Sequence, residues 1–269
     1  MECRATAKRH YRRALITGAT SGIGAAFAAA LPPTTDLLLS ARSEEQLAQA
    51  RDTLAQPGRE IEIAPADLRQ PDAVAALVER AEAFAIDLLI NNAGTGQIGA
   101  VLDHTLEAET AAAMVNVVAK VALTRSLLPG MIERAKCDGS SAGVIILSSA
   151  AAFAPVPYFT TYAATKAFCL HYGEGLAEEL RGEPVSVLVV CPGATRTAFG
   201  GRAGYGGEMP CASEPEDVAR KALAALGRQT VVVTGALSPV ALSPLLGPRR
   251  LFTGALGAGM RMVAGRAQR

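Results

Sequence analysis

The sequence predicts an α/β protein with one doubly wound, mostly parallel seven-stranded sheet between two layers of helices, a three-layer αβα sandwich. Short β-type runs alternate with longer helical patterns along the chain, and this alternation is typical of parallel strands joined by crossover helices. Most of the β-type runs are continuous Val, Ile and Leu, as expected of strands covered on both faces. A glycine-rich turn separates the first strand from the first helix.

The predicted strands are short and mostly apolar throughout, except that the third alternates apolar and polar residues. They lie at residues 13–17, 36–41, 60–66, 87–90, 143–148, 184–190 and 230–234.

Helices are expected between these strands, at about residues 22–31, 43–55, 71–84, 107–135, 160–181 and 214–227. Ser43 with an acidic first turn indicates the start of the second helix, and Pro71 opens the third. No break in composition indicates a second domain. We therefore expect one domain over residues 13–235, between a basic N-terminal extension (1–12) and a basic C-terminal segment (236–269).

The composition narrows the class of protein. The 269 residues are 50% hydrophobic and 19% charged, with a formal net charge of +1. This excludes a disordered chain and gives no reason to expect nucleic acid binding. Five cysteines are scattered without a Cys-x-x-Cys pair, and three histidines lie far apart. No metal site is expected, and reduced cysteines in a cytoplasmic protein fit best.

Residues 14–31 carry no charge and follow a basic N-terminus, as a secretory signal would. Glycine, serine and threonine residues interrupt the run, however, with the composition of a turn. A strand, a loop and a helix explain each of them. The signal or membrane-spanning interpretation is the lesser alternative.

The stretch LITGATSGIG (15–24) has the composition of a nucleotide-binding turn. Gly18, Gly22 and Gly24 lie between a predicted strand and a predicted helix. Glycines let the backbone approach a pyrophosphate, which then lies at the helix N-terminus. A plain strand-to-helix connection is the alternative, but the position after the first strand favours a nucleotide.

The end of the second predicted strand favours NADP(H) over NAD(H). An NAD site usually has an acidic residue about 20 residues after the glycine-rich turn, bound to the ribose 2′-hydroxyl. Here the strand ends in Arg42, and the first acid is Glu44. Arg42 can pair with a 2′-phosphate that a carboxylate would repel. The alternative is a solvated arginine at a helix start.

Six short motifs now support a family resemblance: TGATSGIG (17–24), NNAG (91–94), Asn116, Ser149, YAATK (162–166) and PGATRT (192–197). In order and spacing they resemble those of the classical short-chain dehydrogenases/reductases, over about residues 13–235. The resemblance implies a Rossmann-type fold and an NADP(H)-dependent oxidoreductase. Hydride would be transferred between a nicotinamide and a small-molecule ketone, aldehyde or secondary alcohol.

The resemblance implies that Asn116, Ser149, Tyr162 and Lys166 are catalytic. Ser149 precedes Tyr162 by 13 residues, the family's interval. Tyr158 misses this interval and is expected to line the substrate pocket or to pack. Tyr162 would be the general acid/base. Cationic Lys166, one helical turn away, and an oxidised nicotinamide are expected to lower the phenol pKa from about 10.

The other catalytic residues have distinct implied roles. Ser149 would hydrogen-bond the substrate carbonyl, and Lys166 would also hold the nicotinamide ribose. Asn116 would hold a water that relays protons to Lys166. Its residue-based alternative is a core asparagine whose amide is fully hydrogen-bonded.

The resemblance also implies the cofactor contacts. Asp67 would face the adenine, and Pro192, Gly193 and Thr197 would border the nicotinamide. The full set is Gly18, Thr20, Ser21, Gly22, Ile23, Gly24, Arg42, Asp67, Leu68, Asn91, Ala93, Gly94, Tyr162, Lys166, Pro192, Gly193, Thr195 and Thr197.

Two segments fall where the family varies. Residues 198–213 contain five glycines in sixteen positions, which indicates either a mobile lid over the ligand or a plain surface loop. Residues 237–269 have five arginines and no acid. This tail is expected to pack over the pocket, to contact another subunit, or to make weak peripheral contact with an anionic membrane.

The helix expected at 107–135 is apolar nearly all round, more than one sheet face requires. The resemblance implies that such helices pair across subunits, so a homodimer or homotetramer is expected. The rival to an enzyme is a catalytically silent NADP-binding scaffold or redox sensor. Such loss usually shows as a missing tyrosine or lysine, and both Tyr162 and Lys166 are present.

Overall fold

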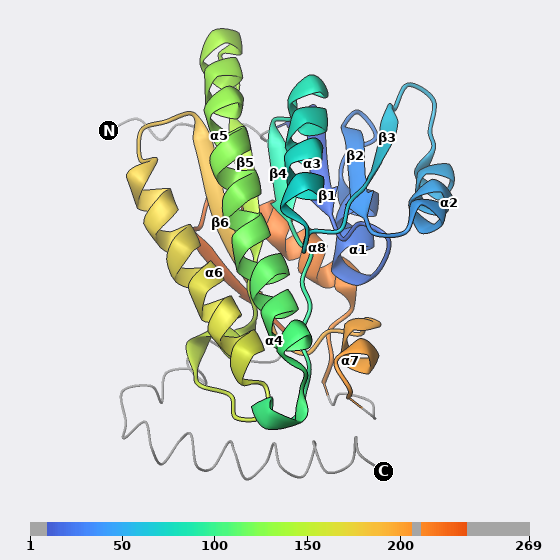
Figure 1. The fold of residues 1–269 in the computed structure, drawn as a ribbon. Coiled ribbons are helices and arrows are strands. Elements are labelled where there is room, and N and C mark those ends of the chain that lie inside the picture. The colour runs from blue at the N-terminus through green and yellow to red at the C-terminus, as the bar shows by residue number, and fades with distance from the viewer. Residues whose placement is uncertain (1–9, 206–210, 236–269) are drawn as a thin grey trace.

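The strands form one seven-stranded sheet in the order β3-β2-β1-β4-β5-β6-β7 (Figure 1). The computed structural model describes residues 10–205 and 211–235. All six strand pairings are parallel, so the prediction of a doubly wound parallel sheet is confirmed. The strands are β1 (Arg13–Thr17), β2 (Asp36–Ala41), β3 (Ile61–Pro65), β4 (Leu88–Asn91), β5 (Ala142–Leu147), β6 (Val185–Pro192) and β7 (Val231–Thr234).

Helices cover both faces of this sheet. One face is covered by α1 (Gly22–Ala30), α2 (Glu44–Leu54) and α8 (Pro215–Ala225), and the other by α3 (Pro71–Ala83), α5 (Ala119–Asp138) and α6 (Thr160–Glu179). Residues 14–31 thus form a strand, a turn and a helix, as predicted. Three short elements were not predicted: η1 (Val101–Asp103), η3 (Ala150–Phe153) and α7 (Phe199–Arg202).

Neighbouring residues of each central strand enter opposite halves of the core. In β1, Ile16 packs with the α1 and α8 side, while Leu15 packs with the α3 and α5 side. In β4, Ile90 and Leu89 divide in the same way. Successive side chains of a strand point to opposite faces, so a sheet covered twice needs apolar residues at every position. This explains the uninterrupted Val, Ile and Leu runs.

The segment expected as one helix over 107–135 is divided into three parts. It begins with α4 (Leu106–Ala113), passes through a π-helical segment η2 (Met114–Val118) and continues as α5. Such π-helical turns are rare in proteins, and those that do occur are often at functional sites. Within the described residues, 106–138 is also the one helical stretch long and apolar enough to cross a membrane, with a mean hydropathy of 1.4. Its apolar residues include Leu123, Leu127 and Met131, which lie in the core.

The carboxyl ends of the strands create a crevice at one edge of the sheet. The chain leaves β1 toward one side and β4 toward the other, because the strand order reverses between them. In open parallel sheets, ligands bind at this reversal. The glycine-rich turn follows β1, and the NNAG residues end β4. The fold therefore brings these two motifs to the same point.

Several expectations fall outside the described residues. These are residues 1–9 of the N-terminal extension, residues 206–210 of the glycine-rich loop and the whole C-terminal segment 236–269.

Candidate active site

The turn after β1 can be made only with glycine at its key positions. Gly18 and Gly22 have φ angles of +66° and +55°, which side-chain-bearing residues rarely adopt. A Cβ on Gly24 would lie 2.1 Å from the carbonyl oxygen of Gly18. Helix α1 can therefore approach β1 closely enough to present its N-terminus to the crevice.

Asn92 fastens this turn to the end of β4. Its Nδ2 donates to the carbonyl oxygens of Thr17 (2.8 Å) and Gly18 (3.2 Å). In return, the Thr17 hydroxyl accepts from the backbone N–H groups of Asn92 and Ala93. The sequence predicted Asn91 in this place instead. Asn91 is buried, donates to Thr124 Oγ1 at 2.8 Å and does not line the pocket.

A pocket of about 1590 Å³ opens along this edge of the sheet. The predicted cofactor residues that line it are Gly18, Thr20, Ser21, Gly22, Ile23, Arg42, Asp67, Leu68, Ala93, Gly94 and Thr197. The other predicted residues are not among those that line it: Gly24, Asn91, Asn116, Ser149, Tyr162, Lys166, Pro192, Gly193 and Thr195.

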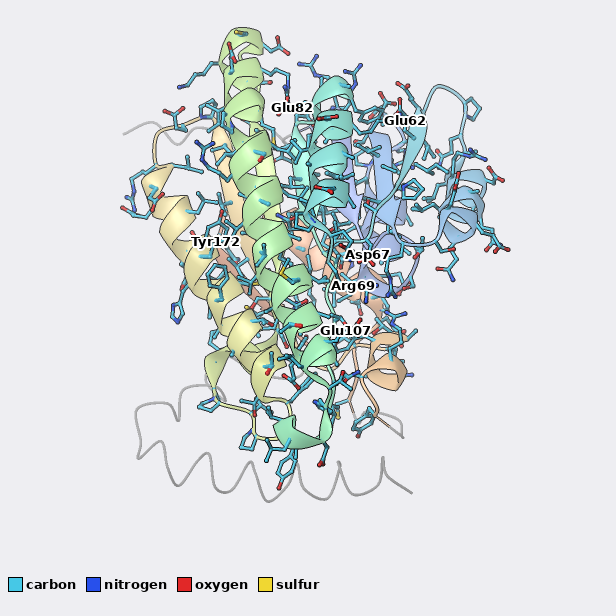
Figure 2. All side chains as sticks on the ribbon, viewed as in Figure 1. Glu62, Asp67, Arg69, Glu82, Glu107 and Tyr172 are labelled. Carbon is cyan, nitrogen blue, oxygen red and sulfur yellow. The ribbon has the colours of Figure 1, made fainter. Side chains whose placement is uncertain are left out.

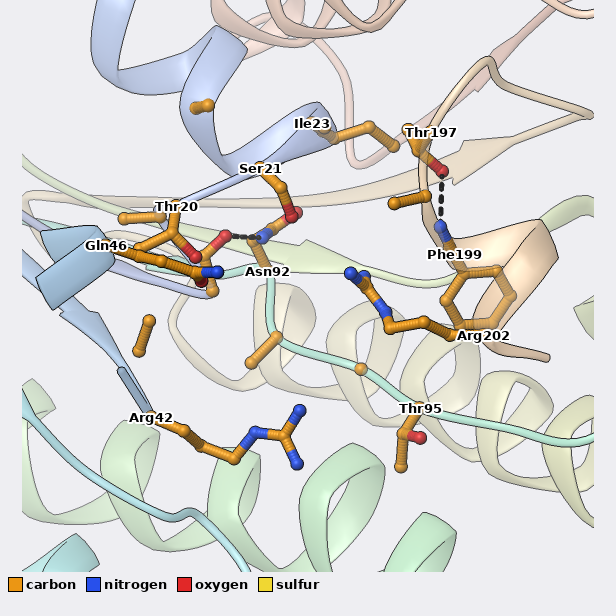
Figure 3. A pocket seen from close by; sticks show the side chains of 18 of the residues that line it. Thr20, Ser21, Ile23, Arg42, Gln46, Asn92, Thr95, Thr197, Phe199 and Arg202 are labelled. Atoms are coloured by element: carbon orange, nitrogen blue, oxygen red, sulfur yellow. Dashed lines mark hydrogen bonds between the residues drawn. The ribbon is translucent and has the colours of Figure 1, made fainter. Parts of the chain in front are cut away.

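Two arginines extend into this pocket from different elements. Arg42 follows β2 and Arg202 ends α7, and Figure 3 shows both guanidinium groups extending toward the middle of the pocket. Neither has an ion pair within the described part of the chain. Both arginines are exposed. Arg42 was predicted from its place after the second strand, but no signal in the glycine-rich loop singled out Arg202.

The adenine side of the predicted site contains a charge cluster. Arg69 binds the Asp67 carboxylate through Nη2 at 2.6 Å and approaches Glu107 at 3.9 Å (Figure 2). The hydrogen bonds from Arg69 hold the pKa of Asp67 below its usual value, and the charge of Arg42 acts in the same direction. Arg69 was not predicted, because its partner is only two residues away and any exposed loop can hold such a pair.

Tyr162 lies in α6 between two aromatic rings. Phe159 stacks on it with ring centroids 4.1 Å apart, and Phe199 of α7 is tilted against it at 5.3 Å. Lys166 is placed as the spacing predicted, with Nζ 5.3 Å from the Tyr162 ring centroid. Ser149, the residue before η3, forms a hydrogen bond with Tyr162. The structure therefore brings together Ser149, Tyr162 and Lys166.

Tyr158 is apart from this group. It precedes α6 in a left-handed conformation with φ of +62°, and its carbonyl accepts from the Gly99 N–H at 2.9 Å.

In the chain without a cofactor the pKa of Tyr162 is raised, and the lowering expected beside an oxidised nicotinamide stays a prediction. Burial among apolar groups raises the pKa of Tyr162 to about 12, and the hydrogen bond with Ser149 offsets only part of this. Burial also lowers the pKa of Lys166. Its Nζ donates to the carbonyl oxygen of Leu147 at 3.1 Å. Desolvation of the phenolate thus outweighs the nearby cation.

Asn116 is fully bonded inside the π-helical segment. Its Oδ1 accepts from the N–H of Thr95 at 2.9 Å, and its Nδ2 donates to Thr95 O at 2.8 Å and Thr165 Oγ1 at 2.9 Å. The Asn116 carbonyl accepts from Cys169 Sγ at 3.2 Å. This matches the alternative of a satisfied core asparagine. The role of Asn116 in a proton relay stays a prediction.

Gly94 lies against the side chains of both Asn116 and Lys166. A Cβ at this position would be 3.2 Å from Asn116 Oδ1 and 3.3 Å from Lys166 Nζ. A side chain here would crowd the lysine, which explains glycine at the end of NNAG.

Lys120 is a second lysine of the site that the sequence did not reveal. It lies in the first turn of α5, is 3% exposed, and donates from Nζ to the carbonyl oxygen of Leu147 at 2.7 Å. Burial, and then the charge of Lys166, lowers the pKa of Lys120 to about 7. A lysine in a helical pattern ordinarily indicates a solvent-facing position, so no signal could have found it.

The comparisons with known proteins support one family. A model of the short chain dehydrogenase family matches residues 12–204. Ketoacyl reductase HetN of Nostoc is 33% identical over 182 residues, which are 66% of this chain and 62% of that protein. The chain thus spans less than two thirds of that relative's length. A very-long-chain 3-oxoacyl-CoA reductase of Anas platyrhynchos is 31% identical over 81% of this chain and 69% of its own length.

Solved structures agree. A short-chain dehydrogenase from Sphingobium yanoikuyae in complex with NADPH is 32% identical, with a TM-score of 0.75 over 93% of this chain and 94% of that chain. A 7β-hydroxysteroid dehydrogenase, at 24% identity and a TM-score of 0.80 over 91% of this chain and 96% of that chain, shares the fold. The chain belongs to the short-chain dehydrogenase family.

Proposed function

We propose that this protein is an NADP(H)-dependent oxidoreductase that transfers hydride between a nicotinamide and a carbonyl or secondary alcohol, with Tyr162 as general acid/base. The observation that carries the proposal is the meeting of Ser149, Tyr162 and Lys166 behind the pocket that the glycine-rich turn forms. An acid/base residue needs a bonded orienting group and a neighbouring charge, and this cluster supplies both.

The pocket fits a dinucleotide phosphate. The glycine-rich turn offers close backbone approach, since a Cβ at Gly22 would lie 2.8 Å from Thr197 Cγ2. Residues Gly18 to Ile23 would hold the pyrophosphate, Asp67 and Leu68 the adenine, and Arg42 a 2′-phosphate. When bound, the cofactor would supply or accept the hydride.

The residues of the chain would handle the proton. The Ser149 hydroxyl would orient the substrate oxygen beside the Tyr162 hydroxyl. A phenol is protonated at neutral pH whether its pKa is near 10 or raised to about 12, so Tyr162 would carry the proton that this oxygen receives on reduction. NADP(H) as the cofactor would favour reduction as the working direction. The Lys166 ammonium would stabilise the phenolate left behind.

The names of similar proteins point to the substrate class. Two similar proteins are described as ketoacyl and 3-oxoacyl-CoA reductases, and a similar solved structure is an L-sorbose reductase with NADPH. We propose a small-molecule ketone or aldehyde as the substrate of this chain. The aromatic rings of Phe159 and Phe199 around Tyr162 favour a partly apolar one.

The domain extent, the cellular location and the oligomeric state of the enzyme are also proposed. One catalytic domain would cover residues 13–235, in the cytoplasm, with weak peripheral membrane contact through the basic tail. A homodimer or homotetramer would form through α5 and α6, where Val118, just before α5, and Phe168 are 47% and 39% exposed.

Cofactor binding tests the proposal. Thermal shift is measured with NADPH and with NADH on the wild type, on Arg42→Ala and on Arg51→Ala. Arg51 lies on α2 outside the pocket and pairs with Asp52. NADPH should stabilise the wild type and Arg51→Ala more than NADH does, and Arg42→Ala should lose this preference. Equal stabilisation by both cofactors would remove Arg42 from the proposal. No shift with either would contradict the proposed cofactor, whereas a shift with NADPH but no turnover would favour a silent scaffold.

Turnover is then followed by NADPH consumption over a panel of ketones and aldehydes. Tyr162→Phe should lower kcat by about 10²- to 10⁴-fold and leave NADPH binding intact. Full activity in Tyr162→Phe would exclude Tyr162 as the acid.

A further inference from the structure

Two buried lysines share a single hydrogen-bond acceptor behind the pocket. Lys120 Nζ and Lys166 Nζ donate to the same carbonyl oxygen, that of Leu147, at 2.7 Å and 3.1 Å. Each residue is 3% exposed. Because both distances end at one oxygen, the two nitrogens are closer together than the sum of these distances. Leu147 ends β5, and the lysines arrive from α5 and α6 on the same face of the sheet.

No carboxylate neutralises this pair. Among the described residues, neither lysine has an ion-pair partner. The titratable groups that face the pair are the thiols of Cys169 on α6 and Cys191 on β6, together with Tyr162. Burial raises the pKa of the Cys191 thiol to about 12, so that group supplies no charge at neutral pH.

Two full positive charges are unfavourable in such a place. A buried ammonium without a counter-ion is costly, and a second one within hydrogen-bond distance of the same atom adds repulsion. One carbonyl oxygen can accept from both amines whether or not each is charged, because a neutral amine still donates an N–H. The geometry therefore favours a state in which both hydrogen bonds persist and only one amine is protonated. The lowered pKa values of both lysines agree with this.

We propose that Lys120 is a positioning residue of the active site, which shares the Leu147 carbonyl with Lys166 so that the two amines hold one proton between them near neutral pH. The inference rests on the proposed role of Lys166 beside Tyr162. Transfer of that proton from Lys166 to Lys120 leaves the total charge unchanged and leaves Lys166 as a neutral amine. Lys120 thus sets how much positive charge faces Tyr162.

The backbone around the pair holds this arrangement in place. The Ser148 hydroxyl donates to the carbonyl oxygen of Lys166 at 2.7 Å, which fastens α6 to the end of β5. Asn116, one turn before Lys120, bonds Thr165 beside Lys166. Two helices are thereby fixed to one another at the level of the two amines, so their separation is a property of the fold.

The proton count of the lysines can be measured without cofactor or substrate. The full chain is labelled with ¹³C-lysine, and the Cε–Hε signals are followed from about pH 6 to about pH 11, a range that brackets the ordinary lysine pKa of about 10.4. Signals are assigned by their loss in Lys120→Met and Lys166→Met. The expected result is one buried lysine signal that titrates near neutrality, coupled to a second that titrates well above it.

The variants then test the coupling. In Lys120→Met the Lys166 midpoint should rise by about one pH unit, a tenfold change in proton affinity. In Lys120→Arg, where the arginine keeps a permanent positive charge at position 120, the Lys166 midpoint should fall. Lys120 and Lys166 signals that both stay ammonium-like until about pH 10 would overturn the proposal, and so would an unchanged Lys166 midpoint in Lys120→Met. The wild-type titration decides alone if these variants do not fold. Because turnover is not used, this result is separate from that of Tyr162→Phe.

Discussion

The ring of Phe199 lies 5.3 Å from the ring of Tyr162, tilted by 43°. Phe199 begins α7, in the loop that the sequence marked as variable and rich in glycine. Thr197, just before it, packs over the glycine-rich turn, and its hydroxyl accepts from the Phe199 N–H at 3.3 Å. One short segment thus contacts both the proposed cofactor turn and the proposed acid. This links the loop to the desolvation of the tyrosine.

Removal of the Phe199 ring should make Tyr162 easier to ionise. Burial is the main cause of its raised pKa, so Phe199→Ala should lower the Tyr162 pKa from about 12 toward the ordinary value near 10. Ultraviolet difference titration of tyrosinate measures it, with Tyr162→Phe in each background to identify the signal. An unchanged titration curve would show that Phe199 does not control solvent access to Tyr162.

Gly24 should tolerate no side chain, whereas another helical glycine should. In Gly24→Ala the new Cβ would meet the Gly18 carbonyl oxygen at 2.1 Å, so the turn must shift, and both NADPH binding and stability should fall. A Cβ added to Gly175 in α6 would have nothing within 4 Å. Gly175→Ala should therefore be neutral or stabilise the protein by about 0.5–1 kcal/mol. Urea unfolding with and without NADPH compares them. Equal behaviour of the two variants would contradict the close approach of α1 to β1.

The exposed apolar positions on α5 and α6 should form a subunit interface. Phe168 is 39% exposed and stacks on Tyr172 with centroids 5.6 Å apart. A buried aspartate at this position would lack a partner, so Phe168→Asp should shift the oligomer toward monomer. Light scattering at micromolar concentration measures the mass. Leu102→Asp is the matched control, because Leu102 is 96% exposed and belongs to η1, not to α5 or α6. A monomeric wild type would contradict the interface.

The sequence predicted the parts of the molecule in which the local structure requires one kind of residue. Strands covered on both faces need continuous apolar runs, and the turn after β1 needs glycine at Gly18 and Gly22 because of their positive φ angles. The Tyr162 and Lys166 pair followed from helical spacing. These features depend on residues close together in the chain.

Features that depend on distant contacts escaped prediction. The π-helical segment at Met114–Val118 has the same apolar pattern as an ordinary helix, and only the contacts of Asn116 with Thr95 and Thr165 distinguish it. In the sequence Lys120 resembles a surface lysine, but in the folded protein β5 and α6 enclose it. The raised pKa of Tyr162 likewise arises from burial, and one of the rings that contact it, Phe199, lies 37 residues further along the chain.

Lys120 should make the stability of the protein rise with pH above neutrality. Its pKa is lowered from 10.5 to about 7 in the folded chain. Between these values the unfolded chain binds more protons, so the free energy of unfolding increases with pH. Each pH unit in this range adds at most about 1.4 kcal/mol to the free energy of unfolding. The gain is complete above the unfolded value of 10.5 and is absent below the folded value of about 7.

Lys120→Met removes this dependence, and urea unfolding at several pH values measures it. The variant should be more stable than the wild type near pH 7, where burial of the amine costs most, and the difference should shrink as the pH approaches the ordinary lysine pKa of 10.5. Lys221 on α8 is exposed, so Lys221→Met should run parallel to the wild type. Parallel curves for Lys120→Met would mean that the buried amine keeps its proton in the folded protein.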